Sequence, residues 1–164
     1  MARAYTSAQL GTLAHVALTG DRPPHGHLAT WLALLELDGG IGFDVDRIER
    51  AEITIGDAGR ATCWTGPYFL TGAAIEVAER QPAVRRARLL EARGFERVER
   101  PWEQQGRKRR RARVWYVRPA DGEPIVQLCT RTGHATLWTR TNPRRCLGSF
   151  EADDDIGAAL PALA

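Results

Sequence analysis

The chain has 164 residues, of which 43% are apolar, and it carries a formal net charge of +3. A chain of this length can bury a core without disulfides or a metal, and its composition excludes a disordered chain, a collagen and a disulfide scaffold. No apolar run reaches the length that a membrane span needs. The first residues also lack the apolar region of a secretory signal, so we expect a cytoplasmic protein.

The three cysteines, Cys63, Cys129 and Cys146, are odd in number and widely spaced. No CxxC pair is present, so the sequence supports neither a zinc ribbon nor a thioredoxin-type redox motif. We expect reduced thiols, with Cys63 and Cys129 packed in strands as small apolar side chains.

The N-terminal half of the chain is predicted to be mostly helical. Thr6 and Gln9 have the spacing of a capping box, and an apolar helical stripe runs from Leu10 to Gly20. The other elements expected before Gly94 are a helix from Leu28 that ends before Gly39, a hairpin at 51–64, and helices at 71–80 and 82–93.

After Gly94 the pattern changes to strands separated by turns. Strands are expected at 95–100, 113–118, 125–130 and 135–140. Because consecutive strands joined by short turns pair in antiparallel order, these strands predict a meander, with one long connection at 101–112.

The predicted fold class is therefore α+β, with N-terminal helices and a hairpin, then a helix packed on an antiparallel meander that carries a long basic loop. We expect a single domain over residues 1–148, helical up to residue 94 and rich in β-strands from residue 95. Residues 149–164 are expected to form an acidic and flexible tail.

The charge is strongly segregated along the chain. Residues 85–118 carry thirteen basic and four acidic side chains, whereas residues 149–164 carry four acids and no base. All but one of the 23 basic residues are arginine. This skew fits the coding bias of a GC-rich bacterial or phage genome, but arginine is also the better phosphate ligand, because its planar guanidinium donates two parallel hydrogen bonds. Six cations occupy the seven positions from Arg107 to Arg113. Their mutual repulsion predicts an anionic partner, and the alternative is a solvated, flexible loop that aids solubility.

The arginine-rich outer face of the predicted helix 82–93 and the basic loop at 101–112 are predicted to form one surface that contacts phosphate groups. Trp102, at the base of the loop, is expected to be exposed and able to stack on a base, whereas Trp115 and Trp138 are interpreted as core residues. The expected nucleic-acid-binding residues are Arg85, Arg86, Arg88, Arg93, Trp102, Arg107, Lys108, Arg109, Arg110, Arg111 and Arg113. The sequence therefore predicts a small non-enzymatic DNA- or RNA-binding or accessory protein, with contacts mostly to the phosphate backbone.

The order helix, strand, basic loop and strand over residues 82–118 resembles the recognition helix and wing of winged-helix DNA-binding domains. In that family the helix enters the major groove and the wing contacts the backbone or the minor groove. A helix packed on an antiparallel sheet with a basic loop is also similar to double-stranded-RNA-binding domains. Both resemblances imply a nucleic-acid partner, and neither assigns a role to an individual residue.

Two other functions remain open from the sequence. If the basic loop docks on an acidic protein, the chain is an adaptor or inhibitor of the phage or mobile-element type. Asp44 and Asp46, with Glu49 and Glu52, form a group of carboxylates that suits the divalent ion of a nuclease, but Asp46 equally suits a helix N-cap. No phosphate-binding glycine loop and no seryl-hydrolase motif occurs. No cofactor, metal or catalytic residue is therefore assigned, and His134 has no evident partner.

The acidic tail suggests a way of regulating the basic loop. Asp153, Asp154 and Asp155 would fold back onto the hairpin and compete with phosphate, so that only strong ligands displace them. The alternative is a terminus without contacts.

Overall fold

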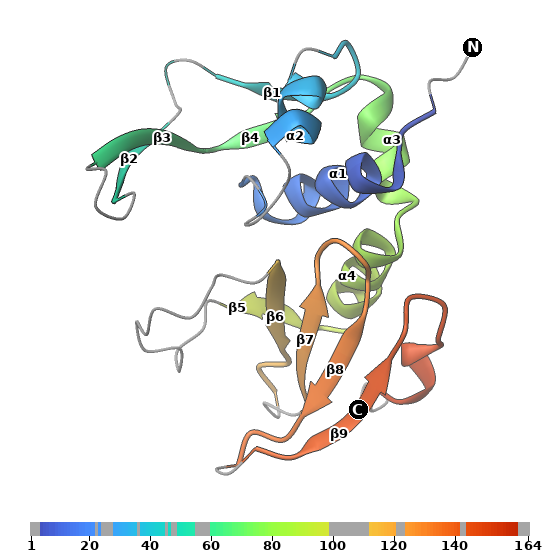
Figure 1. Ribbon diagram of the computed structural model, residues 1–164. Coiled ribbons are helices and arrows are strands. Elements are labelled where there is room, and N and C mark those ends of the chain that lie inside the picture. Colours follow the sequence, from blue (N-terminus) through green and yellow to red (C-terminus); the bar gives the residue numbers. More distant parts are fainter. Residues whose placement is uncertain are drawn as a thin grey trace. The chain divides into compact units, whose positions relative to one another are not determined.

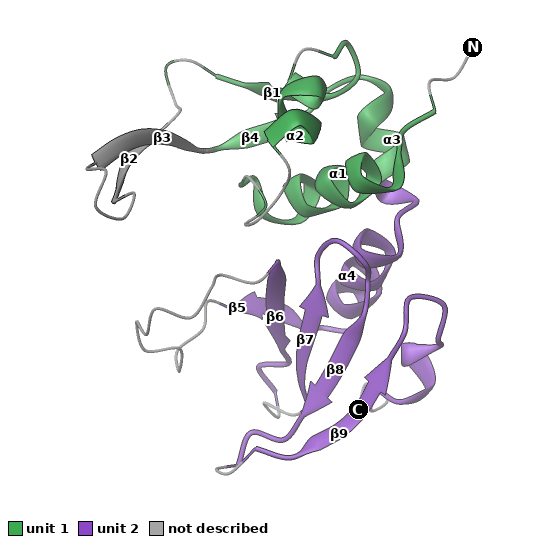
Figure 2. Cartoon of the chain, in the orientation of Figure 1, with its two compact units in different colours: residues 1–78 green, residues 79–164 purple. Residues whose placement is uncertain are grey.

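The computed structural model shows helices and antiparallel sheets in a chain that divides into two units, residues 1–78 and residues 79–164 (Figures 1 and 2). The predicted α+β class is thereby confirmed. The structure describes residues 4–21, 23, 28–35, 37–44, 46, 49–54, 60–98, 112–120, 124–141 and 144–160, and gives only the backbone for 49–54 and 60–66. Among the helices of this described part, none combines the length and apolar character required to cross a membrane.

The first unit begins with the helix that the capping box predicted. α1 spans Ser7–Thr19, where Thr6 Oγ1 accepts a hydrogen bond from the Gln9 amide and the Gln9 side chain accepts one from the Thr6 amide. Gly20 ends the helix at a φ of +70°, a conformation that strains any residue with a Cβ. Both ends of α1 are thus fixed by local sequence.

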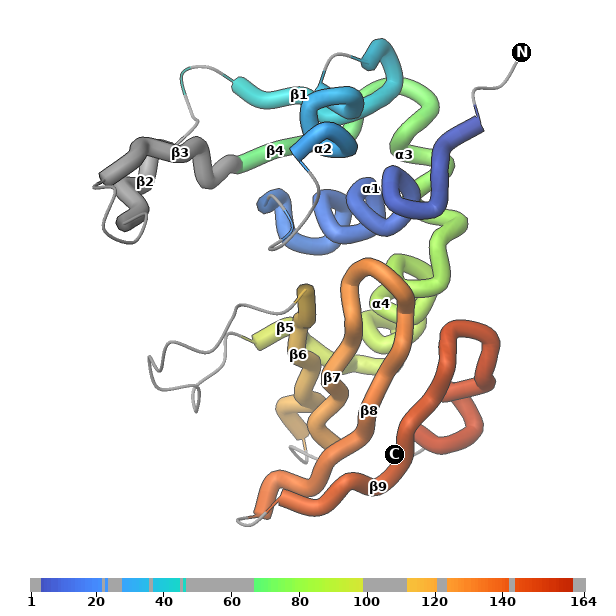
Figure 3. The backbone as a smooth tube through the Cα atoms, in the orientation of Figure 1, coloured from blue at the N-terminus to red at the C-terminus, as the bar shows by residue number. Residues whose placement is uncertain are grey.

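The rest of the first unit consists of two short helices and two antiparallel pairs of strands. They are α2 Leu28–Leu35, β1 Ile41–Phe43, β2 Glu49–Thr54, β3 Arg60–Gly66, β4 Tyr68–Leu70 and α3 Ala73–Glu79, which ends on the first residue of the second unit. β2 pairs with β3, as predicted for the hairpin at 51–64. β1 pairs with β4 across a long stretch of sequence (Figure 3), a pairing that the sequence did not predict.

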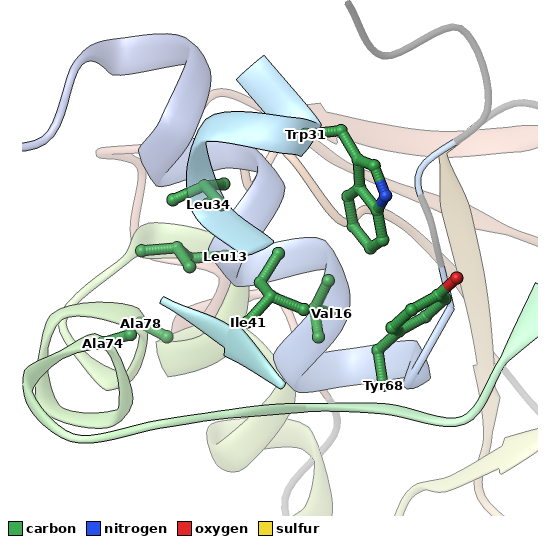
Figure 4. Packing of buried hydrophobic residues seen from close by; sticks show 8 residues of the cluster. All are labelled: Leu13, Val16, Trp31, Leu34, Ile41, Tyr68, Ala74 and Ala78. Carbon is green, nitrogen blue, oxygen red and sulfur yellow. The ribbon is translucent and has the colours of Figure 1, made fainter. Parts of the chain in front are cut away.

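The core of the first unit is drawn from all three helices and from both strands of the β1–β4 pair. Figure 4 shows its buried members, which are Leu13, Val16, Trp31, Leu34, Ile41, Tyr68, Ala74 and Ala78. Trp31 meets Tyr68 edge to face, with 4.8 Å between the ring centroids, a geometry that aromatic pairs favour. Tyr68 is therefore a core residue.

The second unit consists of one helix and a five-stranded antiparallel meander (Figure 1). α4 spans Pro82–Ala92, and the strands are β5 Glu96–Val98, β6 Arg113–Val117, β7 Ile125–Cys129, β8 Ala135–Trp138 and β9 Cys146–Phe150, in that spatial order. The predicted four-strand meander is present, and β9 adds a fifth strand. The expected change from helix to strand at residue 94 therefore falls inside this unit.

One row of side chains on this sheet carries most of the core of the second unit. Residues directly opposite each other in a ladder point to the same side of the sheet. The row consists of Val114, Tyr116, Val126, Leu128, Ala135 and Leu137, all buried. α4 contacts β7 and adds four fully buried apolar side chains, those of Ala83, Val84, Ala87 and Leu90.

Residues 149–160, part of the predicted acidic tail, contribute regular structure and buried side chains to the second unit. Ser149 and Phe150 complete β9, and a 3-10 turn follows at Ile156–Ala158. Ile156 is 1% exposed and Leu160 is 5% exposed. Burial of these two apolar side chains secures the segment despite its acidic composition; residues 161–164 lie outside the described residues.

Burial of Tyr116 should make the second unit sensitive to alkaline pH. Desolvation, helped by the nearby charge of Glu91, raises the pKa of Tyr116 to about 12. The folded state then holds the phenolic proton more tightly than the unfolded state, whose pKa is about 10. The resulting stabilisation is complete below about pH 10 and falls by about 2 kcal/mol as the pH rises to about 12.

We therefore expect Tyr116→Phe to reduce the loss of unfolding free energy between about pH 9 and about pH 12. Urea unfolding followed by tryptophan fluorescence measures the difference, with the value at the lower pH as the internal reference. An equally steep loss in both proteins would contradict the burial argument.

Candidate nucleic-acid interface

The strands on either side of the basic loop form a hydrogen-bonded hairpin. β5 and β6 pair antiparallel, with Glu96 opposite Val117 and Val98 opposite Trp115. The apolar and aromatic run of β6 favours a strand, and its middle residues are buried. Val98, the last residue of β5, pairs with Trp115 of β6. The connection from β5 to β6 therefore begins and ends at the same end of this hairpin.

The predicted loop residues Arg107, Lys108, Arg109, Arg110, Arg111 and Trp102 lie outside the described residues. Arg113, the first residue of β6, is described: it is partly buried and lies opposite Cys129 of β7. Trp115 is 6% exposed, in agreement with its interpretation as a core residue.

The four arginines predicted on the outer face of α4 have three different surroundings. Arg85 is exposed. Arg88 is about half exposed and pairs with Glu79 at 2.9 Å and with Glu91 at 3.0 Å. Both carboxylates raise the pKa of Arg88, so a phosphate would have to displace them. Arg93 is partly buried and donates a hydrogen bond to the carbonyl of Gly157.

Arg86 corrects the expectation that these arginines all face outwards, because it is 5% exposed. Its Nη1 donates to the carbonyl oxygens of Gly133 and Phe150, and its Nη2 donates to those of Glu151 and Asp154. The guanidinium is therefore satisfied by four backbone carbonyls, and its fork geometry suits this task.

Burial removes the charged guanidinium of Arg86 from water, and nearby acids offset part of the free-energy cost of this desolvation. Desolvation lowers the pKa of Arg86, while the carboxylates of Asp154, Asp153 and Glu151 raise it. A buried charge is tolerated when hydrogen bonds replace its hydration shell. Arg86 therefore joins α4 to the turn before β8 and to the end of β9, and both of its Nη atoms already donate hydrogen bonds.

The acidic segment also has short-range hydrogen bonds of its own. Asp154 Oδ2 accepts from the Glu151 amide at 2.6 Å, and Asp155 Oδ1 accepts from the Gly157 amide at 2.8 Å, which caps the 3-10 turn. A hollow of about 300 Å³ lies between this segment and α4, lined by Pro82, Arg85, Arg86, Leu89, Ala152, Asp153, Asp154, Asp155 and Ile156. The three aspartates thus lie beside α4, and their competition for the basic loop stays a prediction.

His134 and Ser149 form a contact that sequence reasoning missed. His134 Nε2 lies 2.8 Å from Ser149 Oγ, and Glu151 Oε1 lies 3.9 Å from the same ring nitrogen. In a catalytic triad the acid holds the other nitrogen of the ring, so that the first can take the serine proton. The β8–β9 pairing that brings the two residues together could not be read from the sequence, and their arrangement is that of a surface hydrogen bond.

The carboxylates of the nuclease alternative lie just after β1. Both Asp44 and Asp46 are exposed, and Asp44 Oδ1 accepts a hydrogen bond from the Asp46 amide at 3.0 Å, which is the local turn that aspartate favours. Within the described residues no group of three or more His, Cys, Asp or Glu side chains is placed to hold a metal ion. These two acids alone do not make a metal centre.

Comparison with known proteins yields no family, no curated protein and no solved structure that matches this chain. The likeness of residues 82–118 to winged-helix and double-stranded-RNA-binding domains is therefore limited to the local order α4, β5, β6.

Replacement of Arg86 by methionine should destabilise the second unit, because a side chain of similar length would leave four carbonyls without their donor. We expect a loss of about 3 kcal/mol. Arg85→Met, at the exposed neighbouring position, is the matched control and should change stability by less than about 0.5 kcal/mol. Urea unfolding of both variants measures the difference, and equal stabilities would show that the carbonyl contacts contribute nothing.

Proposed function

We propose that the protein is a small, non-enzymatic nucleic-acid-binding protein that contacts the phosphate backbone through the basic connection between β5 and β6. The observation that carries this proposal is the β5–β6 ladder, which ties both ends of a segment with six cations in seven positions to one hairpin. A rigid base limits the conformational entropy that such a segment loses when it binds.

Neutralisation of phosphates would release the counterions condensed on the nucleic acid, and this release is the main driving force for binding by basic segments. It would also relieve the repulsion between the adjacent cations. Backbone contacts of this kind give affinity with little choice of sequence.

The contribution of α4 to the interface is smaller than the sequence predicted. Arg86 and Arg93 donate to backbone carbonyls, and Arg88 is shared by two glutamates. Arg85 is the exposed arginine of the four without such a contact in the described part of the chain. The proposed interface is therefore centred on residues 107–113, with Arg85 as an accessory contact.

Replacement of Arg109, Arg110 and Arg111 by alanine should weaken binding to duplex DNA, single-stranded DNA and RNA alike. We expect the slope of log K against log salt to fall by about two to three, one unit for each lost phosphate contact. Fluorescence anisotropy at about 50 mM and about 200 mM salt measures both quantities. The matched control replaces the same three residues by lysine, which keeps the charge and should keep most of the salt dependence.

Unchanged affinity of the alanine variant would overturn the proposal. A protein that the wild type retains from nuclease-treated lysate, combined with absence of binding in the anisotropy assay, would replace it with the adaptor function. If the wild type nicks a plasmid in the presence of Mg²⁺ and Asp44→Asn abolishes this nicking, the nuclease function would replace the proposed one.

A further inference from the structure

β9 is the last strand of the five-stranded sheet, and in the described part of the chain only one of its edges is paired. β8 pairs with it along one side, with Leu137 opposite Gly148 and Trp138 opposite Cys146. Leu147, between these two partners, is an extra residue with no counterpart on β8. A strand edge offers unpaired amides and carbonyls to any further strand that approaches it.

The side chains of β9 do not protect this edge. Leu147 is 57% exposed, the highest value among the exposed large apolar side chains, and Cys146 and Ser149 are exposed as well. Natural edge strands usually carry charged residues, proline or a bulge, which discourage pairing, and of these β9 has only the extra residue Leu147. Within Cys146–Phe150 there is no charged residue and no proline.

The charges that flank β9 are complementary to each other. Arg145 precedes the strand and Glu151 follows it, each three residues from Gly148. Both side chains are exposed, that of Glu151 at 82%. When two copies of this segment run antiparallel with their glycines opposite each other, Arg145 of each copy faces Glu151 of the other. The segment is thus complementary to itself.

We propose that β9 pairs with β9 of a second copy of this chain, in antiparallel register about Gly148. The pairing joins the sheets of both copies into one continuous sheet. Leu147 of each copy then faces Ser149 of the other, and the two leucines become diagonal neighbours, close enough to contact each other. Two arginine–glutamate pairs, one at each end, fix the register.

The same pairing would leave the proposed nucleic-acid interface free. β5 and β6 lie at the opposite side of the sheet from β9. Nine strand spacings separate the β5 strands of the two copies, which corresponds to about 43 Å. The dimer therefore presents two basic segments on one assembly, and its formation does not depend on whether they bind nucleic acid.

Sedimentation equilibrium of the full chain, from about 5 µM to about 500 µM at low salt, tests the pairing. A reducing agent prevents a disulfide through the exposed Cys146. The wild type should shift from monomer to dimer as its concentration rises. Arg145→Glu and Glu151→Arg should each weaken the dimer about tenfold, because each change turns both ion pairs into like-charge contacts. The double variant should regain the wild-type constant within about threefold.

Leu147→Lys should also weaken the dimer, whereas Leu28→Lys should leave it unchanged. Leu28 is the matched control because it is an exposed leucine of the first unit, at 56% exposure. Circular dichroism confirms that each variant is folded. A monomer at every concentration, a dimer that none of the variants weakens, or a double variant that stays monomeric would each overturn the proposal.

Discussion

The second unit depends on the buried guanidinium of Arg86. Arg86 leaves α4 and donates hydrogen bonds to carbonyls of the turn before β8, of the end of β9 and of the acidic segment that follows. These acceptors lie 47 to 68 residues away along the chain. One side chain therefore joins α4 to these segments through hydrogen bonds to backbone carbonyls. The carboxylates of Asp154, Asp153 and Glu151 offset part of the desolvation cost.

The arginines of residues 85–113 therefore serve two different purposes. Around α4 the guanidinium groups satisfy backbone carbonyls or pair with glutamates, so they contribute to folding. Between β5 and β6 the density of cations exceeds what the local acids can neutralise, since residues 99–113 contain only two glutamates. The proposed partner supplies the missing negative charge.

The sequence predicted the features that depend on near neighbours. The capping box of Thr6 and Gln9, the start of α4 at Pro82 and the antiparallel order of the meander all follow from residues close together in the chain. The β1–β4 pair was missed because its ladder is long-range, and the fifth strand β9 was missed because Cys146–Phe150 lacks a clear alternation of apolar and polar residues.

The burial of Arg86 could have been suspected. Ala83, Arg86, Ala87 and Leu90 follow the spacing of one helix face, and all four are buried. The charge of Arg86 led us to predict an exposed side chain. The carbonyls that accept its hydrogen bonds come from segments that are distant in the sequence. The contact between His134 and Ser149 was missed for the same reason, because it depends on the pairing of β8 with β9.

The most direct test of the central claim is the salt dependence of binding by the unmodified protein. For a short duplex, six cations that each neutralise one phosphate predict a slope of log K against log salt of about −5, and a shallower slope for a single strand. Absence of binding at about 50 mM salt, or an affinity that does not change with salt, would contradict the account.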